Sequence, residues 1–170
     1  MKTRIPGWTR VVLALIALAD LETGAWALVS PRSWYERFPG FGRHWIVAVG
    51  PAFNEHLVRD AAAGFFAVGL GAAIAAVWPR RDFVILASAL VVVHSLPHFL
   101  YHVTNPVPAL STTDVITGVW GLALESAAGL AVLATALRTR ASDASESVDA
   151  SLAGTAQREN GRRRAAARMR

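Results

Sequence analysis

The sequence contains no cysteine and very little methionine, and these absences exclude several kinds of site. Without cysteine the chain cannot form disulfides, iron–sulfur clusters or thiolate metal sites, although this says nothing about its redox compartment. The 2 methionines, Met1 and Met169, lie near the two ends of the chain, which excludes a thioether copper(I) site. No internal repeat is visible.

Charged residues are also scarce. Only 17% of the 170 residues are charged and 54% are hydrophobic, which is too apolar for a soluble domain of this length. The hydrophobic residues are gathered into long runs, as in membrane-spanning segments. Most of the net charge of +5 comes from eight arginines and four acidic residues between Arg138 and Arg170. The basic character therefore belongs to a tail and does not indicate a specific nucleic-acid-binding surface.

Four hydrophobic segments stand out, at about residues 11–29, 57–78, 83–103 and 114–137. Each approaches the roughly 20 residues that a helix needs to cross a hydrocarbon core of about 30 Å. Lipid offers no hydrogen-bond partner to the backbone, so helix is the expected form. We predict an all-α integral membrane protein, with a four-helix transmembrane domain over residues 1–137 and a disordered basic tail over residues 138–170.

The first segment also has features of a cleavable signal peptide. A basic start precedes "VVLALIALA", and "AWA" resembles a cleavage site. Asp20 and Glu22 interrupt the approach to that site, and the apolar run resumes through Val29. We therefore predict that the segment is retained as a transmembrane helix.

Basic residues in the loops predict the orientation. They precede the first span, they lie between the second and third spans as Arg80 and Arg81, and they recur in the tail. With four spans these parts share one side, which the positive-inside rule makes cytoplasmic. The loop "SWYERFPGFGRHW" carries arginines on the other side, but its aromatic residues predict a segment lying in the outer interface.

We predict a multi-pass protein of the bacterial cytoplasmic membrane, and the basic loops predict that both termini lie in the cytoplasm. The lipid bilayer is its first expected partner. A homo-oligomer and a membrane-protein partner both stay open.

Ionisable residues inside the spans are the main functional signal, because each costs a few kcal/mol in a bilayer. The spans hold one arginine, Arg59, which cannot neutralise the carboxylates by ion pairing alone. These carboxylates number five: Asp20, Glu22, Asp60, Asp114 and Glu125. The polar groups either satisfy one another or line a site. Asp20 and Glu22 point to nearly opposite faces, and the sequence leaves open which of them faces that site.

The stretch "HSLPHFLYH" places His94, His98 and His102 four residues apart, so that they share about 80° of one helix face. In the second segment, His56 and Asp60 also share a face, which continues through small residues at positions 63, 67, 71 and 75. Small residues let helices approach closely in lipid, so we predict that this face points into the bundle.

These patterns predict a cavity that opens to the outside of the membrane. The proposed metal ligands are His56, Asp60, His98 and His102, because histidines at i and i+4 bring both imidazoles to one side. Nitrogen and carboxylate ligands suit zinc, iron or copper, and haem b is an alternative if His56 faces His98 or His102. The further polar residues expected to line or support the cavity are Asp20, Arg59, His94, Asp114 and Glu125.

Over residues 34–64, "FPGFGRHW…GPAFNEHLVRDAAAG" resembles a stretch of small bacterial four-helix membrane proteins that are loosely similar to DoxX. The resemblance implies a four-helix fold and no particular activity. Three classes of function stay open: a metal- or haem-binding protein, which includes an enzyme or redox subunit; a non-catalytic partner subunit; and a small proton-coupled transporter.

Overall fold

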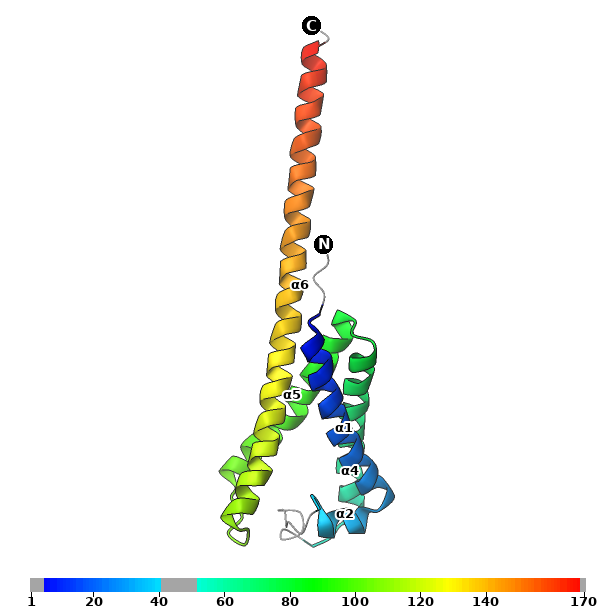
Figure 1. Cartoon of the computed structure of the whole chain (residues 1–170), viewed down its shortest axis with the longest axis vertical. Coiled ribbons are helices and arrows are strands. Elements are labelled where there is room, and N and C mark those ends of the chain that lie inside the picture. Colours follow the sequence, from blue (N-terminus) through cyan, green and yellow to red (C-terminus); the bar gives the residue numbers. More distant parts are fainter. Residues whose placement is uncertain (1–4, 41–51, 169–170) are drawn as a thin grey trace.

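The computed structural model describes residues 5–40 and 52–168, with side chains described up to Thr139 and at Gln157. It consists of five helices in this part of the chain, and the described residues contain no strand (Figure 1). The helices are α1 (Gly7–Val29), α2 (Pro31–Arg37), α4 (Glu55–Val77), α5 (Arg81–Thr104) and α6 (Thr112–Arg168).

Four of these helices are long and apolar enough to cross a membrane: α1, α4, α5 and the part of α6 from Thr112 to Thr139. The prediction of an all-α, four-helix membrane bundle is therefore confirmed, and each predicted span agrees with its helix to within a few residues.

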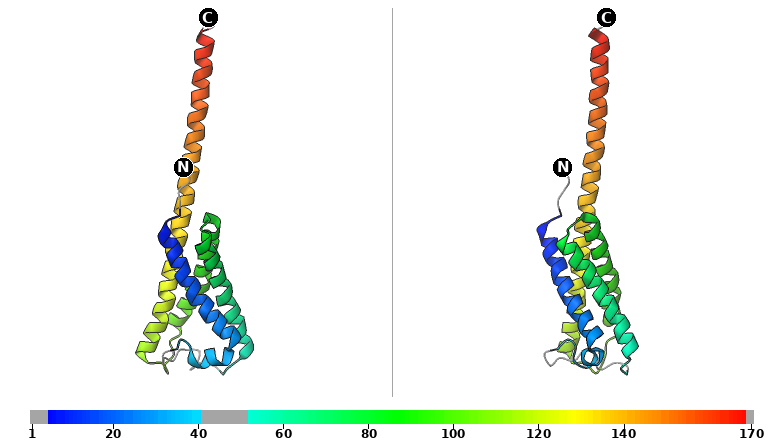
Figure 2. Two further views of the ribbon diagram at one scale, coloured as in Figure 1. Left: turned by 45° about the vertical axis from the view of Figure 1, so that its right-hand side comes forward. Right: turned by 90° about the vertical axis from the view of Figure 1, so that its right-hand side faces the viewer.

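The four long helices form two pairs. α1 packs along α4 and α5 packs along α6, while α4 also contacts α5. The pairs converge where α1 begins and α4 connects to α5, and they diverge toward the end that carries α2 (Figures 1 and 2). We call this wider end the α2 end. α1 starts, and α6 leaves the bundle, at the opposite end (Figure 1).

Two glycines allow α1 and α4 to cross closely. A Cβ atom on Gly24 would lie 2.7 Å from the backbone nitrogen of Phe66, and one on Gly69 would lie 2.8 Å from that of Leu21. Both distances are too short for real carbon atoms. Close helix approach through small residues is the usual way in which helices pack in lipid.

The face that α4 buries differs from the predicted one. The prediction is correct at Ala75, but Ala63 and Ala67 are exposed, and a Cβ atom on Gly71 would meet only Leu90, at an ordinary distance of 3.9 Å. The buried residues are Val58, Ala62, Val68, Gly69, Ala72, Ala75 and Ala76. α4 carries small residues around much of its circumference, so the sequence period alone did not identify the packed side.

Contacts between α5 and α6 combine close packing with a buried polar bond. A Cβ atom on Gly129 would lie 2.8 Å from a methyl carbon of Val91. Near this contact, the buried hydroxyl of Ser126 donates a hydrogen bond of 3.0 Å to that of Ser95. These contacts hold α5 and α6 together as one unit.

The short helix α2 lies across the wider end of the bundle (Figure 2). Pro31 and Trp34 are buried, whereas Arg32, Glu36 and Arg37 are exposed. One apolar and one charged side are the pattern expected of a segment in a membrane interface. The rest of the predicted interfacial segment, from residue 41 onward, lies outside the described residues.

Beyond the bundle, α6 continues as helix to Arg168 and projects past the other helices (Figure 1). The tail that the composition of residues 138–170 predicts to be disordered lies in this projecting part of the chain. Alanine, glutamate and arginine, which recur in this segment, have high helix propensity. A helix without packing partners is only marginally stable in water, so the free energies of the helical and the disordered tail differ little.

Candidate functional site

A cavity of about 570 Å³ lies between the two helix pairs, and all five described helices or their ends contribute to its wall. Apolar residues form most of the surface, including Ile16 of α1, Phe65 of α4 and Ala128 of α6. Trp34 and Phe38 line it from the direction of α2. The lining residues with polar side-chain groups are Asp20, Thr23, Trp34, His98, His102 and Glu125.

Asp20 is the most deeply buried carboxylate of the described residues, with only 3% of its surface exposed. Its neighbour on the facing helix is Gly69, where a Cβ atom would lie 2.9 Å from the Cβ of Asp20. Glu22 is exposed. Because the two residues are separated by about 200° around the helix, packing of α1 on α4 turns Asp20 inward and Glu22 outward.

Glu125 reaches the same cavity from α6 and is half-buried. Its Oε1 atom and the Oδ2 atom of Asp20 are buried and have no hydrogen-bond partner among the described residues. At 1.5 Å per residue, Asp20 lies about 14 Å and Glu125 about 20 Å along its helix from the α2 end. Two carboxyl groups with free acceptor atoms thus lie near the middle of the bundle.

The three histidines of α5 share one side of the helix, as the sequence predicts. The ring centroids of His94 and His98 are 6.3 Å apart, and those of His98 and His102 are 4.8 Å apart. His98 and His102 line the cavity. His94 packs edge-on against Phe65, at 4.7 Å between centroids, and its buried Nε2 atom has no partner among the described residues.

His56 and Asp60 do not line this cavity, so the prediction that they point into the bundle is wrong. Both are exposed, with side-chain exposures of 89% and 62%, and they face each other at 3.4 Å. Arg59 lies beside them in the exposed first turns of α4, which we call the rim. There it bonds Glu55 and the backbone oxygen of Leu28. α4 turns these residues outward because it packs on α1 through Val58 and Ala62 instead.

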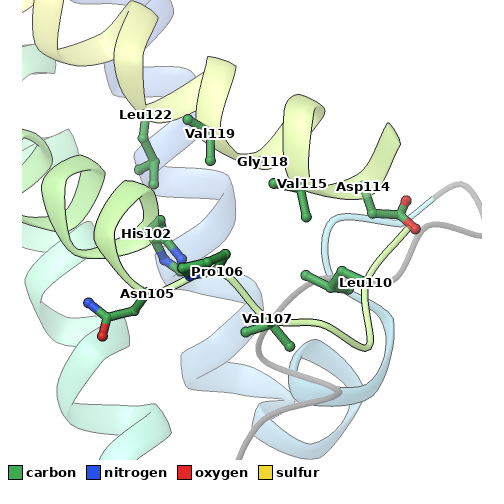
Figure 3. A pocket seen from close by; sticks show the side chains of 10 residues that line it. All are labelled: His102, Asn105, Pro106, Val107, Leu110, Asp114, Val115, Gly118, Val119 and Leu122. Carbon is green, nitrogen blue, oxygen red and sulfur yellow. The ribbon is translucent and has the colours of Figure 1, made fainter. Parts of the chain in front are cut away.

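Asp114 also lies outside the main cavity and has a local structural role. The Ser111 hydroxyl donates a 2.6 Å bond to its carboxylate and accepts a 3.2 Å bond from its backbone N–H. This is the Ser-x-x-Asp arrangement of a helix N-terminus. Asp114 and His102 instead line a separate hollow of about 40 Å³ beside the α5–α6 connection (Figure 3).

The predicted metal-ligand set is therefore not brought together, since His98 and His102 lie in the cavity while His56 and Asp60 lie at the rim. Within residues 5–40 and 52–168, no group of three or more His, Cys, Asp or Glu side chains has a geometry that could hold a metal ion. The same displacement of His56 removes the predicted pairs for haem ligation.

Sequence reasoning missed two aromatic parts of the wall. Trp34 is 5% exposed, and its Nε1 atom is buried without a described hydrogen-bond partner. Phe65 of α4 lines the cavity and packs edge-on against His94 of α5. The clustering of aromatic residues in "SWYERF" indicated an interfacial segment, but nothing in it indicated that one indole turns toward the cavity.

Comparison with protein-family models, curated proteins and solved structures gives no match to this chain. Similarity to DoxX-like proteins accordingly stays a hypothesis from residues 34–64.

Proposed function

We propose that this chain is a multi-pass membrane protein that binds a small, largely apolar molecule bearing a polar group in the cavity between its two helix pairs. The observation that carries the proposal is Asp20. It is only 3% exposed, it lines a cavity with mainly apolar walls, and its Oδ2 atom has no hydrogen-bond partner among the described residues. A polar group buried without a partner costs about 1–3 kcal/mol, which a bound ligand would recover.

The apolar molecule reaches the cavity from the bilayer. Leu15 on α1 and Leu124 on α6 line the cavity, yet they are 63% and 70% exposed. They mark an open side between α1 and α6, which make few contacts with each other. In a membrane this side faces acyl chains, so a lipid-dissolved molecule has direct access.

Orientation is part of the same proposal. The chain lies in the bacterial cytoplasmic membrane with both ends in the cytoplasm, because its basic loops lie at the end where α1 starts. The α2 end then faces outward. His102, His98 and His94 follow each other along α5 from that end toward the level of the carboxyl groups.

Metal binding by His98 and His102 remains a prediction from their spacing. Elemental analysis of protein purified without added metal tests it. A stoichiometric transition metal that is lost in His98→Ala supports it, and protein without metal after incubation with zinc, iron or copper contradicts it.

A steric block tests the proposed cavity function. Gly121 lines the cavity, and a Cβ atom there would have no neighbour within 4 Å. Gly121→Phe should therefore fill the cavity without disturbing the bundle. Ala131→Phe is the matched control, because Ala131 is exposed on the same helix and does not line the cavity.

The probes are 1-adamantanol, 1-adamantylammonium and 1-adamantanecarboxylate, which share one apolar cage. Binding is measured by equilibrium dialysis with protein in phosphatidylcholine nanodiscs, with empty nanodiscs subtracted. We expect saturable binding of at least one probe to the wild type and to Ala131→Phe, and its loss in Gly121→Phe. Saturable binding of none of them to the wild type, or equal binding to Gly121→Phe, would contradict the proposal.

A further inference from the structure

From the charges that line the cavity, we infer that its ligand is a lipophilic monocation, an apolar molecule with an ammonium group that lies between Asp20 and Glu125. This inference rests on the proposed function, and it adds the chemical class of the ligand. It depends on which charged groups face the cavity, which hydrogen-bond partners they lack, and what surrounds them.

The described lining residues include two carboxyl groups and no lysine or arginine. Arginines of α1 and α4 are engaged elsewhere: Arg10 donates to the backbone oxygen of Ala76, and Arg59 bonds Glu55 and the backbone oxygen of Leu28. The cavity therefore has acidic groups without a basic side chain of fixed charge beside them. A cation is the ligand charge that this arrangement favours.

The hydrogen-bonding atoms point to the same class. Asp20 Oδ2 and Glu125 Oε1 are acceptors without described partners, and they come from helices on opposite sides of the cavity. An ammonium group has three N–H donors and no acceptor, so its hydrogen-bonding pattern complements a site with two unpartnered acceptors. Asp20 is more than nine-tenths buried, and a buried polar atom without a hydrogen-bond partner is costly, so a donor from the ligand would be favourable there.

The remaining walls suit the rest of such a molecule. Aromatic rings of Phe65, Trp34 and Phe38 line the cavity, and aromatic faces attract ammonium groups. Toward the open side, the wall is aliphatic at Leu15 and Leu124. The ligand is therefore oriented with its charge inward and its apolar part toward the lipid.

The charge preference of the wild type tests this inference directly. With the three adamantane probes in nanodiscs, we expect the ammonium to bind at least about tenfold more tightly than the carboxylate and the alcohol. Equal or tighter binding of the alcohol or the carboxylate would overturn the inference while leaving the proposed cavity intact. Absence of binding by all three would overturn both.

Isosteric variants locate the charge. Asp20→Asn with Glu125→Gln keeps the shapes of both side chains, so we expect the preference for ammonium to disappear while the alcohol still binds. The matched control is Asp60→Asn, which removes a carboxylate at the exposed rim and should leave all three affinities unchanged. An undiminished ammonium preference in the double variant, or its loss in Asp60→Asn, would overturn the assignment.

Discussion

At the scale of single residues, Gly69 determines how Asp20 enters the cavity. The α4 backbone approaches α1 so closely that a Cβ atom on Gly69 would lie 2.9 Å from the Cβ of Asp20 and 2.8 Å from the backbone nitrogen of Leu21. Gly69 thus lets the α4 backbone pack directly on the turn of α1 that carries Asp20. The close packing of α4 against this turn of α1 therefore keeps Asp20 in the wall of the cavity.

Replacing Gly69 with alanine should destabilise the bundle by about 1–3 kcal/mol, because the added methyl group forces α1 and α4 apart. Thermal unfolding in detergent measures the effect. Gly121→Ala is the control, since it makes the same change in a helix where a Cβ meets nothing within 4 Å. Unchanged stability in Gly69→Ala would show that α1 and α4 do not cross at this point.

At the scale of helices, the pairs α1–α4 and α5–α6 are separate packing units whose divergence leaves room for the cavity. The first pair is joined through Gly24 and Gly69, and the second through Gly129 and the bond between Ser95 and Ser126. Serine pairs of this kind are difficult to find from the sequence, because an isolated serine in a membrane helix often bonds its own backbone, as Ser88 does to Val84.

A double-mutant cycle on Ser95→Ala and Ser126→Ala should give a coupling free energy of about 0.6 kcal/mol, the usual value for hydrogen bonds between membrane helices. Unfolding of the two single variants and the double variant in mixed micelles provides the four free energies. Ser88→Ala with Ser126→Ala is the control pair and should show additive effects. Additivity for Ser95 and Ser126 as well would mean that their hydroxyls do not interact.

At the scale of the whole molecule, the bundle has one narrow end and one wide end. The narrow end gathers the start of α1 and the α4–α5 connection, and α6 leaves there (Figure 1). The wide end carries α2 and the α5–α6 connection. With an even number of spans, both termini lie on the same side of the membrane. The proposed cavity lies mostly in the half of the bundle that is nearer the wide α2 end.

Single cysteines introduced at Ser111 and Ser151 should be labelled from opposite sides of the membrane by an impermeant maleimide. The chain has no cysteine of its own, so each label reports one position. In intact cells, we expect labelling of the Ser111→Cys variant and protection of the Ser151→Cys variant until the cells are broken. Labelling of both variants from the same side would overturn the proposed topology.

Truncation after Thr139 should leave the melting temperature of the bundle unchanged, because the apolar run of α6 ends at Leu137 and the rest of the helix projects beyond the other helices (Figure 1). Thermal unfolding of the full chain and the shortened chain provides the comparison. Circular dichroism of the two measures how much helix the last residues hold in solution. A large fall in melting temperature would show that the tail packs against the bundle.

The sequence by itself determined the class of fold and the positions of the four spans. Long hydrophobic runs have few alternatives in lipid, since only a helix satisfies its own backbone there. It also determined that His94, His98 and His102 share a face, because this follows from their spacing within one helix. It predicted Asp20, His94 and Glu125 as deep polar residues of one site, and the structure brings Asp20 and Glu125 to the same cavity.

Only the tertiary structure decided which side of each helix packs. His56 and Asp60 satisfy the same periodicity as an inward-facing pair, but α4 uses another face and leaves them exposed. In a membrane protein both the packed and the lipid-facing sides are apolar, so hydrophobic periodicity does not distinguish them. Close contacts at Gly24, Gly69 and Gly129 make that distinction, and they depend on two helices meeting in space.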